Sequence, residues 1–285
     1  MALPIPPPVG TAMLPPDTFA GQVALVTGGG TGLGKAMAVE FARLGARVAI
    51  ASRKPDHREA GCAAIAAAGT PGVGVEVDIR DPDAVTRLFT TVEAELGPVD
   101  ILVNNAAGNF PVAAERMSSR AWTSVIDIVL NGTYLCSAEF ARRAIERGAG
   151  GAILNIGATY AWTGGPGTSH SAAAKAAVTN LTQSHAVEWA PHGIRVNCLA
   201  PGKFPHGDLP EQLLALQDPE ADARRIPAGR VGEPHELGWA ATYLCSPFAS
   251  YLTGHTLVLD GANWLRRGLV MPEFVPVADQ LREMR

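Results

Sequence analysis

The fold is decided by the stretch Gln22-Val-Ala-Leu-Val-Thr27 followed by Gly28-Gly-Gly-Thr-Gly-Leu-Gly34. The apolar run is typical of a buried strand, and a helical pattern continues from the glycines through Leu44. A second apolar run, Arg47-Val-Ala-Ile-Ala-Ser52, comes next. This order predicts a βαβ unit with glycines at its first turn, where the backbone and the helix N-terminus can receive a pyrophosphate. In this context the glycines indicate a nucleotide-binding site rather than a merely structural turn.

The glycine loop supplies the first candidate cofactor residues, and the end of the second strand indicates which dinucleotide binds. The loop candidates are Gly28, Gly30, Thr31, Gly32, Leu33 and Gly34. NAD enzymes usually carry a carboxylate for the ribose 2′-hydroxyl after that strand, but here Arg53 and Lys54 follow Ser52. Because a guanidinium pairs well with a 2′-phosphate, we expect NADPH with Arg53 at that phosphate. The alternative is that Arg53 is a solvated surface charge.

Strands and helices alternate along the rest of the chain. Further apolar runs predict strands at 73–77, 99–103, 152–156, 194–199 and 255–261. Helical patterns between them cover 56–68, 119–147, 171–189 and 233–245, and another helix opens at Pro82 with Asp81 as its cap. The alternation predicts an α/β protein: a single-domain Rossmann fold with a doubly wound, seven-stranded parallel sheet and helices on both faces.

The two ends of the chain differ from its middle. Residues 1–16 are proline-rich and predict an extended arm, either disordered or wrapped on a neighbouring subunit. Residues 17–264 form the predicted Rossmann-fold domain. Weak periodicity at about 204–227 predicts a lid that covers the substrate. Residues 265–285 form a C-terminal tail.

Polar groups follow the carboxyl ends of the predicted strands, where sheets of this kind bind ligands. Asp78 and Arg80 come after the third strand, and Asn109 and Phe110 come just past the fourth. We expect Asp78 to accept a hydrogen bond from the adenine amino group. Arg80 is either an ion-pair partner of its neighbours or a cation that faces a phosphorylated substrate tail.

The stretch from Asn155 to Lys175 reads as a buried strand, a glycine-rich loop and the start of a helix. It places Tyr160 in the loop and Ser171 and Lys175 one helical turn apart, so these last two side chains share a helix face. A phenol and an ammonium near one pocket can hold a nicotinamide ribose and polarise a substrate carbonyl. The stretch therefore predicts a catalytic centre.

The composition excludes several kinds of partner. The 285 residues are 47% hydrophobic and 18% charged, with a net charge of −4, which gives no general attraction to nucleic acid or to an anionic membrane. The N-terminus does not read as a signal peptide, and no apolar run approaches the roughly 18 residues of a membrane span, so the expected location is cytoplasmic. No histidine or carboxylate spacing indicates a metal site, and the four cysteines are expected to be reduced thiols.

Three motifs resemble the short-chain dehydrogenase/reductase superfamily: Thr27-Gly-x-x-x-Gly-x-Gly34, Asn104-Asn-Ala-Ala-Gly108 and Pro201-Gly202. The resemblance covers roughly residues 17–264, and the cofactor residues expected on the last two motifs are Asn105, Ala106, Pro201 and Gly202. The superfamily's usual catalytic Tyr-x-x-x-Lys is absent, because Ser171 stands where the tyrosine is expected. The usual catalytic serine falls on Ala158 or Thr159. Members are commonly tetrameric, so the resemblance also implies a homotetramer.

Within the superfamily, the sequence looks very like the mitochondrial-type 2,4-dienoyl-CoA reductases. The similar segments are Leu14-Pro-Pro, Gly28-Gly-Gly-Thr-Gly-Leu-Gly-Lys35, Ala51-Ser-Arg53, Ala107-Gly-Asn-Phe110 and Asp127-Ile-Val-Leu-Asn-Gly-Thr133. The resemblance implies that Asn109 and Tyr160 bind the thioester oxygen. Ser171 is then expected to hold a water, and Lys175 to hold the nicotinamide ribose. The CoA-side contacts implied are Arg80, Phe110 and Ser118. The family's Pro-Gly-Pro-Ile is here Pro201-Gly-Lys-Phe204, which departs from the pattern.

The activity that the resemblance implies is NADPH-dependent reduction of 2,4-dienoyl-CoA thioesters to enoyl-CoA, an auxiliary step in the β-oxidation of unsaturated fatty acids. Serine alone is too weak an acid to replace tyrosine as proton donor, which argues against ordinary ketone reduction. The alternatives are a reductase of 3-oxoacyl thioesters or other carbonyls with Tyr160 as substitute acid, and a 2-enoyl-CoA reductase. A further alternative is a nucleotide-binding sensor or scaffold without turnover.

Overall fold

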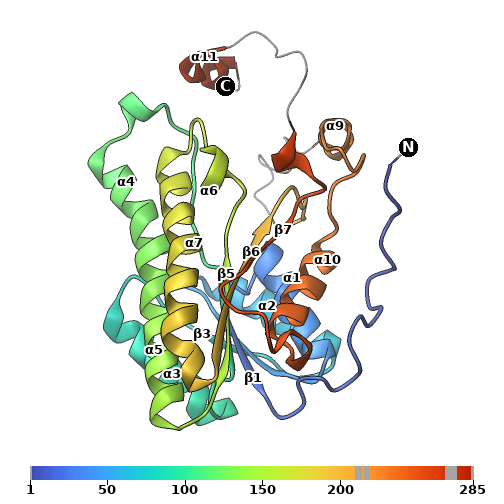
Figure 1. The fold of residues 1–285 in the computed structure, drawn as a ribbon, viewed down its shortest axis with the longest axis vertical. Coiled ribbons are helices and arrows are strands. Elements are labelled where there is room, and N and C mark those ends of the chain that lie inside the picture. Colours follow the sequence, from blue (N-terminus) through green and yellow to red (C-terminus); the bar gives the residue numbers. More distant parts are fainter. Residues whose placement is uncertain (1, 209–213, 215–217, 267–274, 284–285) are drawn as a thin grey trace.

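Seven parallel strands form one sheet in the computed structural model (Figure 1), in the order β3-β2-β1-β4-β5-β6-β7. The structure describes residues 2–208, 214, 218–266 and 275–283. The strands are β1 Val23–Thr27, β2 Arg47–Ala51, β3 Val73–Val75, β4 Ile101–Asn104, β5 Gly151–Ile156, β6 Ile194–Pro201 and β7 Thr256–Leu259. The strand order reverses between β1 and β4, which is where open sheets of this kind bind ligands. The predicted fold class is confirmed.

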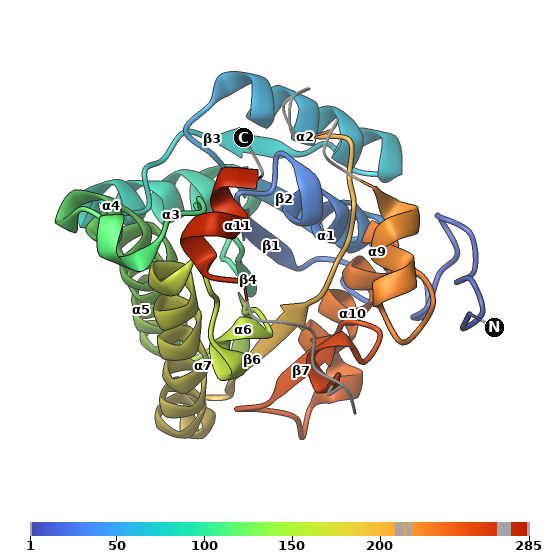
Figure 2. The ribbon, with the colours of Figure 1, turned by 90° about the horizontal axis from the view of Figure 1, so that it is seen from above.

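Helices cover both faces of the sheet (Figure 2). One face carries α1 Gly32–Arg43, α2 Pro55–Ala68 and α10 Pro234–Cys245, and the other carries α3 Pro82–Leu96, α5 Gly132–Glu146 and α7 Ser169–Trp189. The helix α4 Ser119–Ile126 continues into α5 through the π turn Asp127–Asn131. The shorter helices are α6 Tyr160–Thr163, α9 Pro219–Arg225 and α11 Val277–Glu283, with 3₁₀ turns at Ala114–Arg116, Ala190–His192, Pro247–Ala249 and Asn263–Leu265.

The hydrophobic core is split into two layers by the sheet. Every residue of β1 is buried, because helices cover both sides of it, and this explains why the strand reads as a continuous apolar run. On one side, Met37 and Phe41 of α1 pack with Leu237 of α10. On the other side, Phe89 of α3 packs with Phe140 of α5. Packing on both faces of the sheet therefore fixes the helices that flank the ligand edge.

Two sequence-level predictions of element boundaries have different outcomes. Asp81 caps α3 as predicted, since its carboxylate accepts from the backbone N–H of Asp83 at 2.9 Å. The third strand is shorter than the predicted 73–77. It lies at the sheet edge and pairs only with β2, whose last paired residue is Ala51, opposite Val75. Residues 76 and 77 therefore lie beyond the end of the ladder.

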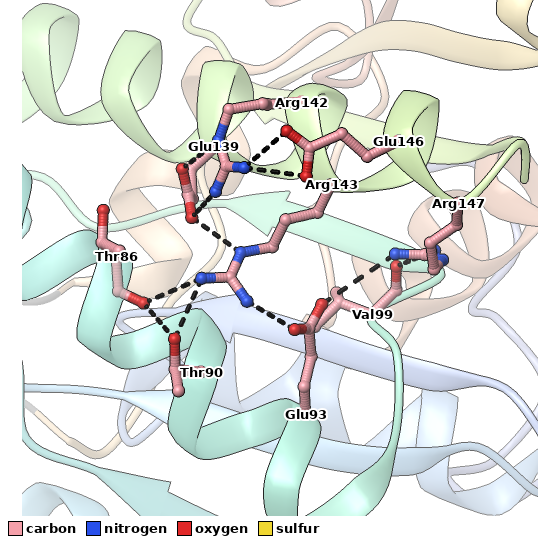
Figure 3. A network of polar contacts seen from close by, with 9 residues as sticks. All are labelled: Thr86, Thr90, Glu93, Val99, Glu139, Arg142, Arg143, Glu146 and Arg147. Atoms are coloured by element: carbon pink, nitrogen blue, oxygen red, sulfur yellow. Dashed lines mark hydrogen bonds and ion pairs between the residues drawn. The ribbon is translucent and has the colours of Figure 1, made fainter.

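An ion-pair network joins α3 to α5 on one face of the sheet (Figure 3). The guanidinium of Arg143 lies 2.5 Å from Glu93 and 2.6 Å from Glu139, and it also donates to Thr90 at 3.0 Å. Its side chain is only 15% exposed, so these contacts are shielded from solvent. Burial alone would raise the pKa of Glu139, but hydrogen bonds from Arg142 and Arg143 outweigh it and lower that pKa. The network fixes α5 against α3.

The N-terminal arm lies against its own chain, beside α10 (Figure 2). The backbone N–H of Leu3 donates to Ala228 at 2.8 Å, and the ring Nε2 of His235 lies 3.0 Å from the carbonyl of Pro7. The indole of Trp239 donates to Thr11 at 3.1 Å. These contacts hold the arm against its own chain, and a contact of the arm with a neighbouring subunit stays a prediction.

The predicted division of the chain stays a prediction at two places. Within the lid at about 204–227, residues 209–213 and 215–217 lie outside the described residues. Within the tail at 265–285, the same holds for 267–274 and 284–285. In the ranges that are described, no helix is both long enough and apolar enough to cross a membrane.

Candidate active site

The glycine turn after β1 opens a cleft of about 360 Å³ at the carboxyl ends of β1, β2 and β4. Gly28 and Gly32 have φ angles of +65° and +53°, which favour glycine. A Cβ on Gly34 would lie 2.3 Å from the carbonyl of Gly28, so the turn cannot accept a side chain there. The closely packed, side-chain-free backbone fits a dinucleotide pyrophosphate.

Most of the predicted cofactor residues line this cleft, and a few do not. Those that line it are Gly28, Thr31, Gly32, Leu33, Gly34, Arg53, Asp78, Asn105 and Ala106. Gly30 instead faces α2, where an added Cβ would lie 2.3 Å from the carbonyl of His57. Pro201 ends β6, and Gly202 follows it so closely against Asp260 that an added Cβ would lie 2.5 Å away. Gly30, Pro201, Gly202 and the predicted ribose residue Lys175 are therefore not among the residues that line the cleft.

The loop after β4 is tied to the glycine turn through Thr27 and Asn105. The hydroxyl of Thr27 accepts from the backbone N–H groups of Asn105 and Ala106, each at 3.0 Å. The side-chain amide of Asn105 donates back to the carbonyls of Thr27 and Gly28 at 3.0 and 3.2 Å. The Asn105 side chain therefore acts as a brace of the turn, while its neighbour Ala106 presents a small surface to the cleft.

Two arginines lie beside Asp78 at the far end of the cleft. Arg80 Nε donates to Asp78 Oδ1 at 2.8 Å, and an Arg53 nitrogen lies 3.9 Å from Asp78 Oδ2. The hydrogen bonds from Arg80 lower the pKa of Asp78, although burial opposes the shift. Of the two readings of Arg80, the structure shows the ion pair with a neighbour. Arg53 is more open, with 58% of its side chain exposed.

Lys175 is a buried ionisable group of the candidate site. Its side chain is buried, and its ammonium donates to the carbonyl of Ile156 at the end of β5. Burial lowers the pKa of Lys175 to about 8, with a small opposing contribution from Cys198. A buried amide ladder holds the helix that carries it: Asn104 donates to Asn155, and Asn155 donates to Thr182 of α7, both at 2.9 Å.

Tyr160 and Ser171 meet in the structure. The phenol oxygen lies 3.1 Å from Ser171 Oγ, within hydrogen-bonding distance, with Tyr160 half-buried and Ser171 buried. The prediction that Tyr160 lies in a loop is wrong, because Tyr160 begins the one-turn helix α6. Two backbone hydrogen bonds close this turn. The N–H of Ala161 donates to the carbonyl of Ala158, and the N–H of Trp162 donates to the carbonyl of Thr159. The turn ends at Gly164, whose φ is +76°.

Asn109 and Phe110 lie in the loop past β4. The side-chain oxygen of Asn109 accepts from the backbone N–H of Phe110 at 2.9 Å, so its NH₂ group remains the donor end of the carboxamide. The ring of Phe110 packs edge-on against His170, with 4.6 Å between the ring centres. His170 is fully buried and precedes Ser171, so this contact joins the loop to the start of α7. Ser118 caps α4 by accepting from Ala121 at 3.2 Å.

Sequence reasoning missed two residues that the structure brings onto the glycine turn. His206 lies so close to Gly32 that an added Cβ there would be 2.9 Å from the imidazole. Asp208 accepts from the backbone N–H of Gly32 at 2.7 Å and from the ammonium of Lys35 at 2.6 Å. Both residues belong to the non-periodic stretch predicted as a lid. No local pattern could have connected them with a turn that lies far away in the sequence.

Comparisons with known proteins agree with this geometry. A family model described as "Enoyl-(Acyl carrier protein) reductase" matches residues 28–262. A Bacillus subtilis protein named "Probable 2,4-dienoyl-CoA reductase", of the (2E)-enoyl-CoA-producing kind, is 39% identical over 246 residues, which cover 86% of this chain and 97% of that one. The peroxisomal 2,4-dienoyl-CoA reductase of Rattus norvegicus, of the (3E)-enoyl-CoA-producing kind, is 39% identical over 255 residues, covering 88% and 86%.

The chain is also similar to solved structures of short-chain dehydrogenases. The crystal structure of a short chain dehydrogenase from Bacillus anthracis superposes with a TM-score of 0.79 at 40% identity, covering 87% of this chain and 98% of that one. The chain belongs to the short-chain dehydrogenase/reductase family. It is an oxidoreductase of that family, and the fold implies a nicotinamide cofactor.

Proposed function

We propose that the protein reduces 2,4-dienoyl-CoA thioesters to enoyl-CoA with NADPH, as an auxiliary step in the β-oxidation of unsaturated fatty acids. The observation that carries the proposal is the contact between Tyr160 and Ser171, with Ser171 in the place of the family's usual acid. A phenol at this position can donate a hydrogen bond to a substrate oxygen without sitting one turn before Lys175. The names of the two reductase relatives support the same substrate class.

Four residues of the chain have separate roles in the proposed reaction. When bound, the nicotinamide supplies a hydride to the δ-carbon of the dienoyl group. Negative charge then gathers on the thioester oxygen, where the hydroxyl of Tyr160 and the NH₂ group of Asn109 donate hydrogen bonds. Preorganised donors of this kind contribute roughly 3 kcal/mol each to transition-state stabilisation. Ser171 holds the water that protonates carbon, and Lys175 holds the ribose hydroxyls.

A 2-enoyl-CoA reductase is the second candidate, because the matching family model is described as an enoyl-(acyl carrier protein) reductase. Reduction of 3-oxoacyl thioesters is less favoured. In that reaction the reacting oxygen must itself gain a proton, and Ser171 is too weak an acid to supply one. Tyr160 would then have to act as the acid from α6.

Product analysis separates these reactions. We expect the purified protein to oxidise NADPH with a short 2,4-dienoyl-CoA and to convert it to a species two hydrogens heavier. Under the same conditions, 3-oxoacyl-CoA and 2-enoyl-CoA should be consumed far more slowly. A preference for either of these substrates would contradict the proposal, and NADPH binding without turnover of any of them would indicate the sensor or scaffold. NMR of the product locates its double bond, on which the names of the two relatives differ.

The preference for NADPH is assigned to Arg53. In Arg53→Ala, the ratio of kcat/KM with NADPH to that with NADH should fall about tenfold, because charge-assisted hydrogen bonds to the 2′-phosphate are lost. Steady-state kinetics with both cofactors provides the measurement. Arg87→Ala is the matched control, since Arg87 is a similarly exposed arginine on α3. An unchanged ratio in Arg53→Ala would leave Arg53 as a solvated surface charge.

The remaining parts of the proposal concern the CoA end of the substrate, the oligomeric state and the cellular location. A CoA-linked substrate places the phosphorylated tail near Arg80, Phe110 and Ser118, and Arg80 would then exchange its partner Asp78 for a phosphate. The homotetramer and the cytoplasmic location stay predictions.

A further inference from the structure

The backbone turn expected to receive the cofactor's pyrophosphate already holds an anion from the chain itself. The segment after β6 crosses to the start of α1, where Asp208 accepts from the N–H of Gly32 at 2.7 Å. The same carboxylate accepts from the ammonium of Lys35 at 2.6 Å. The side chain of Asp208 is 24% exposed, and His206 packs on Gly32 beside it.

The chemistry of this contact is that of phosphate binding. An unpaired backbone N–H at a helix N-terminus and a nearby ammonium together favour a negatively charged oxygen, whether it belongs to a carboxylate or to a phosphate. Burial would raise the pKa of Asp208, but the hydrogen bonds from Lys35 and Gly32 outweigh it and lower that pKa. Asp208 is therefore a carboxylate at neutral pH.

We propose that Asp208 determines cofactor affinity by occupying the pyrophosphate position at Gly32 and Lys35 until the cofactor displaces it. Gly32 has one N–H, and two anions at the same donors repel each other, so carboxylate and pyrophosphate exclude one another. Displacement of Asp208 also moves its neighbour His206, which lines the cleft. Arrival of the cofactor is thereby coupled to the position of the segment 204–208. This inference rests on the nicotinamide cofactor of the family and not on the identity of the acyl substrate.

The size of the effect follows from population arithmetic. The apparent dissociation constant equals the intrinsic one divided by the fraction of molecules whose site is open. If the carboxylate holds the site in roughly nine of ten molecules, removing it tightens cofactor binding about tenfold. We therefore expect Asp208→Ala to lower the Kd for NADPH about tenfold in isothermal titration calorimetry.

A matched variant controls for the change in net charge. Asp222 of α9 also lies in the lid and also pairs with a lysine, since its carboxylate lies 3.1 Å from Lys203. Asp222→Ala removes the same charge but leaves the glycine turn untouched, so its Kd for NADPH should stay within about twofold of the wild type. Equal gains in the two variants would show a general electrostatic effect and overturn the proposal.

A ligand without a pyrophosphate provides the second control. Adenosine 2′-monophosphate carries the adenine and the 2′-phosphate but nothing that reaches Gly32, so Asp208→Ala should leave its Kd unchanged. The proposal fails if Asp208→Ala binds NADPH no more tightly than the wild type, or if adenosine 2′-monophosphate gains as much as NADPH. If the wild type prefers NADH, the assignment of Arg53 fails separately, and the Asp208 test is run with NADH and adenosine.

Discussion

Tyr160→Phe is expected to lower kcat about a hundredfold while the Kd for NADPH stays within about twofold. The substitution deletes one hydroxyl from a half-buried ring and keeps the ring itself, so α6 should remain in place. Loss of one preorganised donor to a developing oxyanion costs roughly 10²–10³ in kcat in comparable sites. The predicted contact with the cofactor runs through Lys175 and the glycine turn, which explains why binding of NADPH should not change.

The measurement combines single-turnover kinetics with a binding titration. Tyr251→Phe is the matched control, because Tyr251 is fully exposed and is not among the residues that line the cleft. Full turnover in Tyr160→Phe would remove Tyr160 from the mechanism. A loss of NADPH affinity as large as the loss in kcat would instead indicate a structural role for the contact with Ser171.

The elements of the fold could be predicted from the sequence because their signals are local. Buried parallel strands read as short apolar runs, and the cap of α3 is formed by residues only two positions apart, Asp81 and Asp83. The end of β3 could not be predicted, since it depends on where the partner strand β2 stops. A short helix such as α6 also leaves little sequence signal, because its turn is closed by only a few backbone bonds.

The site residues, too, could be predicted only where their signals are local in the sequence. Residues that come soon after a strand end, such as Asp78 and Asn105, could be placed at the ligand edge from sequence order alone. The ion pair of Asp78 with Arg80, two positions away, was one of the two predicted alternatives. The contacts of Arg53 with Asp78 and of Asp208 with Gly32 are tertiary and could not be predicted. The latter joins residues that are 176 positions apart. Gly30 belongs to the glycine motif, but only the packing of α2 against it shows why this position has no room for a side chain.

Lys175→Met is expected to make the protein more stable and to abolish most of its activity. Burial lowers the pKa of Lys175 from 10.5 to about 8, so the charged form is disfavoured in the folded protein. This shift corresponds to roughly 3 kcal/mol of stability lost at neutral pH. Methionine is apolar and similar in length, so it removes this cost but also loses the hydrogen bond to Ile156. A net gain of about 1–2 kcal/mol at pH 7 is expected after that loss is subtracted.

The pH dependence distinguishes this explanation from simple repacking. Below pH 8 the lysine is charged in both the folded and the unfolded state, so the full cost is present. Between pH 8 and 10.5 the folded protein releases the proton first, and the stability of the wild type rises relative to that of the variant. The difference in the free energy of unfolding, measured by urea titration, should therefore shrink as the pH is raised from 7 to 10.

Cofactor affinity, on which the activity depends, provides the other half of the test. The variant lacks the ammonium proposed to hold the nicotinamide ribose, so its Kd for NADPH should rise at least about tenfold, the loss expected for a charge-assisted hydrogen bond. Lys203→Met controls for the removal of a lysine, because Lys203 is exposed, pairs with Asp222 and does not line the cleft. A variant that is less stable at pH 7, or whose stability difference stays constant up to pH 10, would contradict the assignment of Lys175 as a strained, buried cation. A site that holds such a cation at a cost to folding does so because its charge is used, and the paired measurement of stability and affinity tests that link directly.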